Sequence, residues 1–232
     1  MKISDKEDVL QNALHTADMQ PSETVSAQND SGEILFQNAG VCIIITPITS
    51  YAENEKFLTA SERNYLNTYG SSHRRDEGST WRAALRRHTA CGETAYADNG
   101  APSCTSDNNI HISISHTSRK AAIIISDKKC GIDIELRQRN FARIAARYMT
   151  PEEVLMPNDF GSSWAGTVWC AKECLYKLAG YPNLDFRRDM KILNVSDNTL
   201  SCSISCPTTS GHNLYTLNVL FIEDHICVWG TV

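Results

Sequence analysis

Residues 109–136, NIHISISHTSRKAAIIISDKKCGIDIEL, contain three apolar runs that are separated by short polar connections. The runs NIHISIS, KAAIIIS and CGIDIEL are short and rich in isoleucine, which is typical of strands. Connections of this length favour antiparallel neighbours, because parallel strands need a long crossover between them. The stretch therefore predicts part of a mostly antiparallel sheet.

Helical patterns lie on both sides of this stretch. Upstream, the sequence predicts two strands within residues 33–48, helices over residues 52–69 and 76–88, and a loop over residues 91–109. Downstream, it predicts a basic helix over residues 140–148, a helix that begins at Thr150-Pro151, the strongest helix over residues 162–180, and three or four strands from Met190 onward. Helices and hairpin-like strands in this succession predict an α+β fold.

Composition excludes several classes of protein. The chain has 232 residues, of which 41% are hydrophobic and 21% are charged, so it is neither disordered nor a coiled coil nor a collagen. No apolar run is long enough to span a bilayer, and the first residues, MKISDKEDVLQ, lack the apolar core of a secretory signal. The net charge of −5 argues against nonspecific nucleic-acid binding. We therefore expect no membrane partner and no nucleic-acid partner.

The cysteine pattern gives no sign of a zinc ribbon. None of the nine cysteines forms a C-x-x-C pair. Several lie inside apolar runs such as VCIII and HICVW, where a free cysteine packs as a small hydrophobic residue. This usage predicts a reducing, cytoplasmic compartment.

A short internal similarity links the two halves of the chain. Residues 58–62, LTASE, and residues 149–153, MTPEE, each precede a helix that carries tryptophan. Two related halves would explain the similarity, and so would two helix starts of similar chemistry.

Two carboxylates occupy alternate positions in the run GIDIE. In a strand, Asp133 and Glu135 share one face while Ile132 and Ile134 share the other. Two carboxylates repel each other, and burial raises that cost, whereas Mg²⁺ would neutralise them. An exposed sheet face with ordinary acids would have the same pattern.

The helix WCAKECLYK places Trp169, Glu173 and Lys177 one turn apart on one face. Glu173 could supply a third carboxylate to a cation, with Lys177 beside it. The alternative is a surface pair of Glu173 and Lys177, which would stabilise the helix by about 0.3–0.5 kcal/mol.

The strand NIHISIS ends in Ser115, His116 and Thr117. Hydroxyl, imidazole and backbone N–H groups at a strand end can bind phosphate. A hydrophilic turn would look the same.

In chain order, the motifs ISISHT, GIDIE and WCAKECLYK resemble those of the 4'-phosphopantetheinyl transferase superfamily. That family has a Ser-His pair after a strand, then G-[IV]-D-x-E, then W-x-x-K-E-x-x-x-K. Every named position is filled here, by Ser115, His116, Gly131, Asp133, Glu135, Trp169, Lys172, Glu173 and Lys177. The upstream run HRRDEGSTWRAALRR, which contains Arg74 and Arg75, resembles the family's arginine-rich helix start.

The resemblance implies a fold of two similar, pseudo-dimeric α+β halves, each a small mostly antiparallel sheet with packed helices, and a site in the cleft between them. It divides the chain into a loose polar segment (residues 1–32), an N-terminal half (residues 33–109) and a C-terminal half with the metal and catalytic motifs (residues 110–232). We expect a monomer whose partners are coenzyme A and a carrier protein.

The resemblance also implies the activity. The protein would transfer 4'-phosphopantetheine from coenzyme A to a serine of an acyl or peptidyl carrier protein, with Mg²⁺ as cofactor, and release adenosine 3',5'-bisphosphate. The metal ligands would be Asp133, Glu135 and Glu173. Glu173 and Lys177 would be catalytic, and coenzyme A would be bound by Arg74, Arg75, Ser115 and His116.

One departure from the family pattern motivates an alternative. The family often has Gly-Lys-Pro before the Ser-His strand, whereas this chain has Gly100-Ala101-Pro102 and therefore lacks a basic phosphate contact. A non-catalytic module that binds coenzyme A or a carrier protein is the first alternative. A Mg²⁺-dependent phosphodiesterase is the second, because D-x-E and a nearby lysine also serve that chemistry.

The basic helix predicted over residues 140–148 suggests a docking surface. Arg139, Arg143 and Arg147 are four residues apart and would form one stripe on an α-helix. Carrier proteins, as the resemblance implies, present an acidic helix that such a stripe would attract. A solvated helix face is the alternative.

Overall fold

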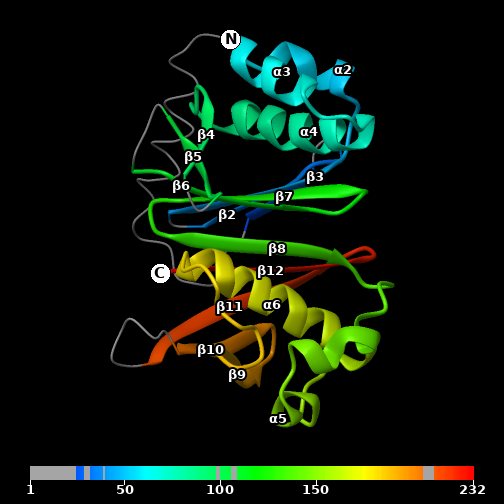
Figure 1. The fold of residues 1–232 in the computed structure, drawn as a ribbon, viewed down its shortest axis with the longest axis vertical. Helices are drawn as coiled ribbons and strands as arrows, with labels where there is room; N and C mark the ends of the chain where they lie inside the picture. The colour runs from blue at the N-terminus through cyan, green and yellow to red at the C-terminus, as the bar shows by residue number, and fades with distance from the viewer. Residues whose placement is uncertain (1–24, 29–31, 39, 98–99, 106–108, 206–211) are drawn as a thin grey trace. The chain divides into compact units, whose positions relative to one another are not determined.

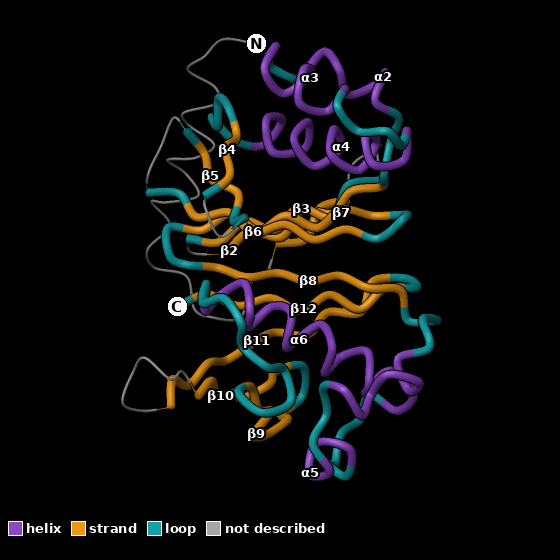
Figure 2. Tube along the Cα trace, in the orientation of Figure 1, coloured by secondary structure: helices purple, strands orange, loops and turns teal. Residues whose placement is uncertain are grey.

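The structure is a computed structural model that describes residues 25–28, 32–38, 40–97, 100–105, 109–205 and 212–232. The chain divides into two compact units, Met1–Lys128 and Lys129–Val232. Both units combine an antiparallel sheet with helices, which confirms the predicted α+β class (Figures 1 and 2).

The first unit contains an antiparallel sheet of seven strands in the order β1-β2-β3-β7-β6-β5-β4. The strands are β1 (Val25–Gln28), β2 (Ile34–Asn38), β3 (Val41–Pro47), β4 (Thr94–Tyr96), β5 (Pro102–Cys104), β6 (His111–His116) and β7 (Lys120–Ser126). The isoleucine-rich strands β3 and β7 pair over seven residues in the middle of the sheet. This position explains why both runs are almost continuously apolar.

Four helical segments accompany this sheet: α2 (Tyr51–Asn54), η1 (Glu55–Phe57), α3 (Ala60–Asn67) and α4 (Ser72–His88). Helix α4 packs against β3 and β7 on one side and against α2 and α3 on the other (Figure 1). The core that results includes Ile44, Trp81, Leu85 and Ile123.

The second unit contains an antiparallel sheet of five strands in the order β8-β12-β11-β10-β9. The strands are β8 (Cys130–Leu136), β9 (Met190–Ser196), β10 (Thr199–Ser205), β11 (His212–Ile222) and β12 (His225–Thr231). The helical segments are η2 (Phe141–Arg147), α5 (Pro151–Val154), η3 (Gly161–Ser163) and α6 (Trp164–Ala179). Helix α6 ends at Gly180, whose left-handed backbone (φ 66°) suits glycine. It packs along β8 and β12 and contributes Val168, Cys170 and Leu175 to the core.

The two units share one topology. In each, the strand that precedes the long helix pairs with the last strand, and the strands between the helix and that last strand follow in reverse chain order. The first unit has two additional strands, β1 and β2, on the other side of β3. Strands β3, β7, β6, β5 and β4 therefore correspond to β8, β12, β11, β10 and β9, and helix α4 corresponds to α6. This correspondence confirms the prediction of two similar α+β halves.

A buried glutamate organises the first unit. Glu62 forms a capping box with Thr59, and it also accepts a hydrogen bond from the backbone N–H of Thr94 on β4 (3.3 Å). Arg86 on α4 pairs with Glu62 (2.7 Å) and donates to the carbonyl of Phe57 (2.7 Å). This glutamate joins a helix start, the long helix and a strand.

The second unit repeats this arrangement. Glu153 forms a capping box with Thr150 and accepts a hydrogen bond from the backbone N–H of Ile192 on β9 (2.9 Å). Lys172 on α6 pairs with Glu153 (2.8 Å) and donates to the carbonyl of Tyr148 (2.6 Å). The similarity of LTASE and MTPEE therefore reflects a repeated structural unit rather than two unrelated helix starts.

The structure differs from the sequence predictions in the bounds of several elements and of the first unit. Val25–Gln28, within the segment predicted to be loose, forms a strand that pairs with β2, while residues 1–24 and 29–31 lie outside the described residues. Residues 91–109, predicted as a loop, contain β4 and β5. The first unit extends to Lys128 instead of residue 109, because β6 and β7 pair within its sheet.

The predicted basic stripe is wrong. Residues 141–147 form a 3₁₀ helix, with three residues per turn, so Arg143 and Arg147 do not share a face. Arg139 lies before this helix, pairs with Glu135, and stacks on Phe141 (5.1 Å). Arg139, whose side chain is half-exposed, is therefore the counterion of a candidate metal ligand.

Cys91 and Cys104 form a disulfide, with Cα atoms 5.6 Å apart. The sequence prediction of a reducing compartment did not anticipate it. The free cysteines among the described residues are Cys42, Cys130, Cys170, Cys174, Cys202 and Cys227. In the described part of the chain, no helix has the length and apolar character that a membrane span requires.

Candidate functional site

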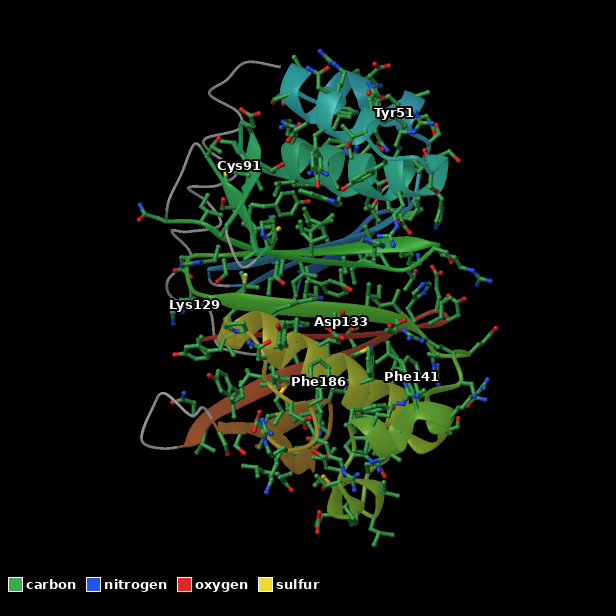
Figure 3. All side chains as sticks on the ribbon, in the orientation of Figure 1. Tyr51, Cys91, Lys129, Asp133, Phe141 and Phe186 are labelled. Atoms are coloured by element: carbon green, nitrogen blue, oxygen red, sulfur yellow. A yellow bond between two sulfur atoms is a disulfide. The ribbon has the colours of Figure 1, made fainter. Side chains whose placement is uncertain are left out.

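Strand β8 and helix α6 bring together the acidic candidates of the second unit. Gly131, Asp133 and Glu135 alternate along β8, and contacts from α6 to Gly131 and Asp133 show that this face is turned toward the helix. Figure 3 labels Asp133, which is only 5% exposed. The alternation inferred from GIDIE therefore directs both carboxylates to the helix that carries Glu173 and Lys177.

Lys177 is bound to Asp133 across these two elements. Its Nζ lies 2.9 Å from Asp133 Oδ1 and donates to the carbonyl of Ile132 (2.7 Å). Burial alone would lower the pKa of Lys177, but Asp133 and Glu173 outweigh burial and raise the pKa. Lys177 is thus a stable ammonium group beside a buried carboxylate, and not half of a surface pair with Glu173.

Glu135 lies between a cation and an indole ring. It pairs with Arg139 and hydrogen-bonds to Trp169. Burial raises the pKa of Glu135, and the Asp133 carboxylate adds to the rise, although Arg139 opposes it. The motif tryptophan therefore supports a candidate metal ligand, a contact that the sequence analysis did not predict.

Glu173 is coupled to both strand carboxylates. Burial raises its pKa, the negative charges of Asp133 and Glu135 add to the rise, and Lys177 opposes it. Two of the three acids therefore have a pKa above the ordinary glutamate value. Burial is the larger cause of both shifts, and the mutual repulsion that the sequence pattern predicted adds to it.

The first unit holds the other four candidates. Ser115 and His116 end β6, and Arg74 and Arg75 lie in the first turn of α4. Glu77 on α4 connects the two elements, because its Oε1 lies 3.4 Å from His116 Nδ1. The sequence analysis named no role for Glu77.

Comparison with known proteins agrees with the motif series. Residues 129–227 match the model of the 4'-phosphopantetheinyl transferase superfamily. The match begins at the first residue of the second unit and includes Asp133, Glu135, Glu173 and Lys177. None of the curated proteins matches the chain. The family match indicates an activity of the phosphopantetheinyl transfer kind.

The second unit, which matches the family model, differs from its structural counterpart at the acidic positions. The seven-pair ladder between β8 and β12 corresponds to the ladder between β3 and β7, which places Ile44 at the position of Asp133. Arg87 follows Arg86 as Glu173 follows Lys172, so an arginine occupies the position of Glu173. The first unit therefore lacks the acidic cluster at the corresponding positions.

The donor chemistry of this unit fits Mg²⁺, which prefers carboxylate oxygens. Asp133, Glu135 and Glu173 supply such oxygens. The pKa values of both glutamates are raised, so their ionised forms are unfavourable here, and a bound cation would stabilise those forms. Among the described residues, however, no group of three or more His, Cys, Asp or Glu side chains has metal-binding geometry. Lys177 and Arg139 are the counterions in this arrangement.

The glycine of the GIDIE motif allows β8 and α6 to approach closely. A Cβ atom at Gly131 would lie 2.5 Å from the Cys174 carbonyl oxygen and 3.0 Å from Leu178 Cγ. Cys174 Sγ in turn lies 3.2 Å from the Gly131 carbonyl oxygen. Glycine is needed here because the helix backbone occupies the space of a side chain.

We expect Gly131→Ala to destabilise the protein by about 1–3 kcal/mol, the usual cost of forcing an extra carbon into a packed core. The helix would have to move away from β8, which would also separate Lys177 from Asp133. Urea denaturation measures the loss. Gly70→Ala is the control, since a Cβ there meets nothing within 4 Å, and equal stability of the two variants would contradict the packing argument.

Lys172 of the W-x-x-K-E motif is structural. Its side chain is fully buried and bound to Glu153, which is itself 1% exposed. Burial lowers the pKa of Lys172, although Glu153 opposes the shift. The motif therefore combines an internal ion pair with the candidate catalytic residues Glu173 and Lys177.

Lys172→Met should cost about 3–5 kcal/mol, because it leaves the buried Glu153 carboxylate without its cation. The double variant Lys172→Met with Glu153→Gln should recover part of this loss, since no unpaired charge remains. Thermal melts of both variants check the coupling. A single variant as stable as the wild type would show that Lys172 is not structural.

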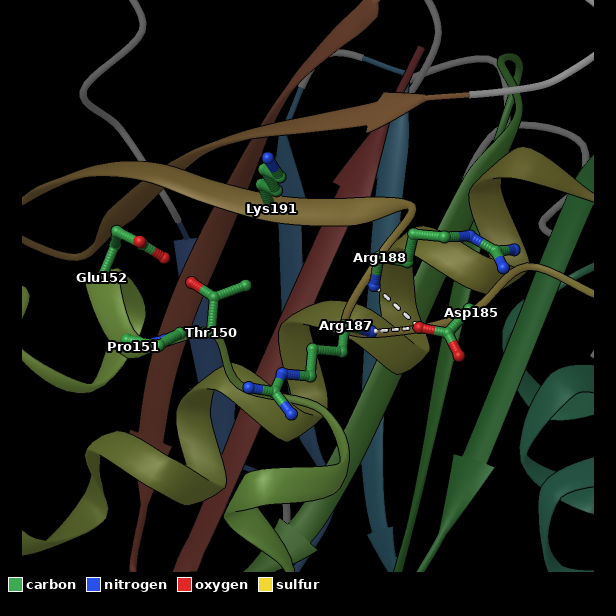
Figure 4. A pocket seen from close by; sticks show the side chains of 7 residues that line it. All are labelled: Thr150, Pro151, Glu152, Asp185, Arg187, Arg188 and Lys191. Carbon is green, nitrogen blue, oxygen red and sulfur yellow. Dashed lines mark hydrogen bonds between the residues drawn. The ribbon is translucent and has the colours of Figure 1, made fainter.

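A pocket of about 450 Å³ lies elsewhere in the second unit (Figure 4) and is lined by Thr150, Pro151, Glu152, Asp185, Arg187, Arg188 and Lys191. The backbone N–H groups of Arg187 and Arg188 donate to Asp185 Oδ1 (3.0 and 2.7 Å), and the Arg188 side chain pairs with Asp189. None of the residues that line this pocket is a candidate catalytic, metal-binding or coenzyme A-binding residue, and we assign the pocket no role.

Proposed function

We propose that this protein transfers 4'-phosphopantetheine from coenzyme A to a serine of an acyl or peptidyl carrier protein and releases adenosine 3',5'-bisphosphate. The observation that carries the proposal is the set of interacting carboxylates Asp133, Glu135 and Glu173, with Lys177 bound to Asp133, within the unit that matches the transferase family. A fold alone would not require three coupled acids in one place.

In this proposal Asp133, Glu135 and Glu173 hold Mg²⁺. When bound, the cation supplies charge neutralisation and orientation for a pyrophosphate. The carboxylates lie on one strand and one helix, and they would have to rearrange to surround a cation, because among the described residues they do not have metal-binding geometry. Displacement of Arg139 from Glu135 would free a ligand oxygen for the cation.

Lys177 stabilises the negative charge that develops on the leaving phosphate. The raised pKa of its ammonium group supports electrostatic stabilisation over proton donation, because a group that holds its proton tightly is a weak general acid.

Glu173 orients the attacking serine hydroxyl and accepts its proton, directly or through water. Its raised pKa supports this role, since a glutamate with a higher pKa is a stronger base near neutral pH. The same residue lies one helical turn from Lys177, so base and cation are separated along a rigid element.

In the first unit, Ser115, His116, Arg74 and Arg75 bind the phosphates of coenzyme A. The arginines are on the first turn of α4, which contains no acidic residue, and His116 is joined to that helix through Glu77. Guanidinium, imidazole and hydroxyl groups are suitable donors to phosphate oxygens.

The deciding experiment incubates the protein with coenzyme A, Mg²⁺ and a panel of apo-carrier proteins, with mass spectrometry as the readout. We expect the phosphopantetheine mass to be added to a carrier serine, and the addition to stop when a chelator is present. Binding of coenzyme A or carrier without transfer would favour the non-catalytic module, which Ala101 motivates. Hydrolysis of phosphodiesters without a carrier would favour the phosphodiesterase alternative.

We also propose that the protein acts as a monomer in the cytoplasm. The six free cysteines among the described residues support a reducing compartment, whereas the Cys91–Cys104 disulfide is a feature that such a compartment rarely maintains. Thiol alkylation of freshly isolated protein, followed by mass spectrometry, measures whether this pair is oxidised in the cell.

A further inference from the structure

Two histidines of the first unit contact one oxygen atom of a buried carboxylate. His73 Nε2 lies 3.0 Å from Glu77 Oε1, and His116 Nδ1 lies 3.4 Å from the same oxygen. His73 lies one turn before Glu77 on α4, while His116 is the last residue of β6. The carboxylate therefore joins two rings that are far apart in the sequence.

Exposure differs sharply within this trio. The side chain of Glu77 is 9% exposed, whereas those of His73 and His116 are 51% and 35% exposed. The acid lies inside and the two rings reach the surface. In this geometry the rings can contact a ligand, and the carboxylate acts through them.

Glu77 also constrains which ring atoms are presented. It contacts Nδ1 of His116 and Nε2 of His73, so the other nitrogen of each ring is turned away from the carboxylate. A carboxylate bound to one ring nitrogen orients the ring, and the outer nitrogen donates to a phosphate oxygen when the ring carries a proton on both nitrogens. One side chain thus sets the orientation of both imidazoles.

The residues around the pair are suited to an anion. Arg74 and Arg75 directly follow His73, and the first turn of α4 contains no acidic residue. Glu77 is the acid shared by the two rings, and its charge is directed at them. A phosphate would meet ring nitrogens and guanidinium groups on this surface.

We propose that His73 binds a phosphate group of coenzyme A together with His116, and that Glu77 is the positioning residue for both rings. This inference rests on the proposed function, because it takes coenzyme A as the ligand. It adds His73 and Glu77 to the binding residues that the motif series names.

Isothermal titration of coenzyme A into the full-length protein tests the pair. We expect His73→Ala to weaken binding about tenfold and Glu77→Gln to weaken it by about three- to tenfold, as for lost hydrogen bonds to charged groups. The matched control is His111→Ala, because His111 is an exposed histidine at the opposite end of β6. Binding by the control should equal that of the wild type.

Three further measurements distinguish a positioning role of Glu77 from a structural role. The effect of the double variant His73→Ala with Glu77→Gln should be smaller than the product of the single effects, since Glu77 acts through the ring that is removed. Nitrogen-15 spectra of the histidine rings should show that Glu77→Gln changes how protons are distributed over the two ring nitrogens of His116. Steady-state kinetics of His73→Ala and Glu77→Gln should show a raised KM for coenzyme A with little change in kcat.

The outcomes distinguish the two proposals. Wild-type protein that does not bind coenzyme A would overturn the proposed function and this inference together. Wild-type binding with unchanged binding by His73→Ala and Glu77→Gln would overturn this inference alone. Because His73 is half-exposed, its alanine variant keeps the test valid even if Glu77→Gln folds poorly.

Discussion

Replacing Glu173 with glutamine should lower phosphopantetheinyl transfer by about 10³-fold and raise the melting temperature of the metal-free protein. Glutamine keeps the length of the side chain but cannot hold a cation by charge or take a proton from serine. Burial raises the pKa of Glu173, with Asp133 and Glu135 adding to the rise, so the ionised form is unfavourable in the folded protein. Removing the charge therefore stabilises the fold while it removes the activity.

The direction of the Glu173 pKa shift determines how the stability difference between the wild type and Glu173→Gln depends on pH. A carboxyl group whose pKa is higher in the folded state destabilises the fold at neutral pH, and the cost disappears as the pH falls below the unfolded value. The metal-free wild type should therefore melt below Glu173→Gln at neutral pH. The difference should shrink as the pH falls through the raised pKa of Glu173.

Thermal melts with and without Mg²⁺, together with the carrier transfer assay, check this prediction. Mg²⁺ should raise the melting temperature of the wild type but have little effect on Glu173→Gln, because a ligand stabilises only the form that binds it. Glu152→Gln is the control, since Glu152 is an exposed acid on α5 outside the cluster. Near-normal transfer by Glu173→Gln would remove Glu173 from the catalytic site.

Replacing Lys177 with methionine should lower turnover by about 10²-fold and reduce stability by about 1–3 kcal/mol, less than for a fully buried pair because Lys177 is partly exposed. The variant leaves Asp133 without the ammonium group 2.9 Å away. If Lys177 only formed a helix-surface pair with Glu173, its loss would reduce stability by less than about 0.5 kcal/mol. Chemical denaturation therefore distinguishes the cross-element pair from the helix-surface pair.

A double variant separates the two effects of Lys177. Asp133→Asn with Lys177→Met removes both charges, so stability should recover relative to Lys177→Met while turnover stays low. Lys129→Met, at an exposed lysine of the same unit, is the matched control and should change neither quantity. Full turnover by Lys177→Met would exclude a catalytic role for Lys177.

Local patterns predicted much of the fold. The isoleucine-rich runs correspond to β3, β6, β7 and β8, and the helix over residues 162–180 corresponds to α6. The prediction of an α-helix over residues 140–148 was wrong. Residues 141–147 form a 3₁₀ helix, and Arg139, which lies before it, pairs with Glu135. The division after residue 109 also differed, since strand pairing with β3 is a long-range property.

In the candidate site, too, local patterns predicted some features and long-range contacts decided others. Strand alternation by itself determined that Asp133 and Glu135 share one face of a strand. Helical spacing by itself determined that Glu173 and Lys177 share one face of a helix. Both conclusions depend only on the period of the backbone. The similarity of LTASE and MTPEE was compatible both with related halves and with two similar helix starts, because a capping box is encoded within four residues. The matching contacts of Glu62 and Glu153 decided for related halves.

Only the tertiary structure decided which partner each charged side chain has. Lys177 and Asp133 are 44 residues apart in sequence, and Lys172 and Glu153 are 19 apart, yet each pair is in direct contact. Glu77 likewise meets His116 through the packing of α4 against the sheet. Such contacts depend on how elements pack at distances of a few ångströms, and the period of a single strand or helix contains no information about that packing.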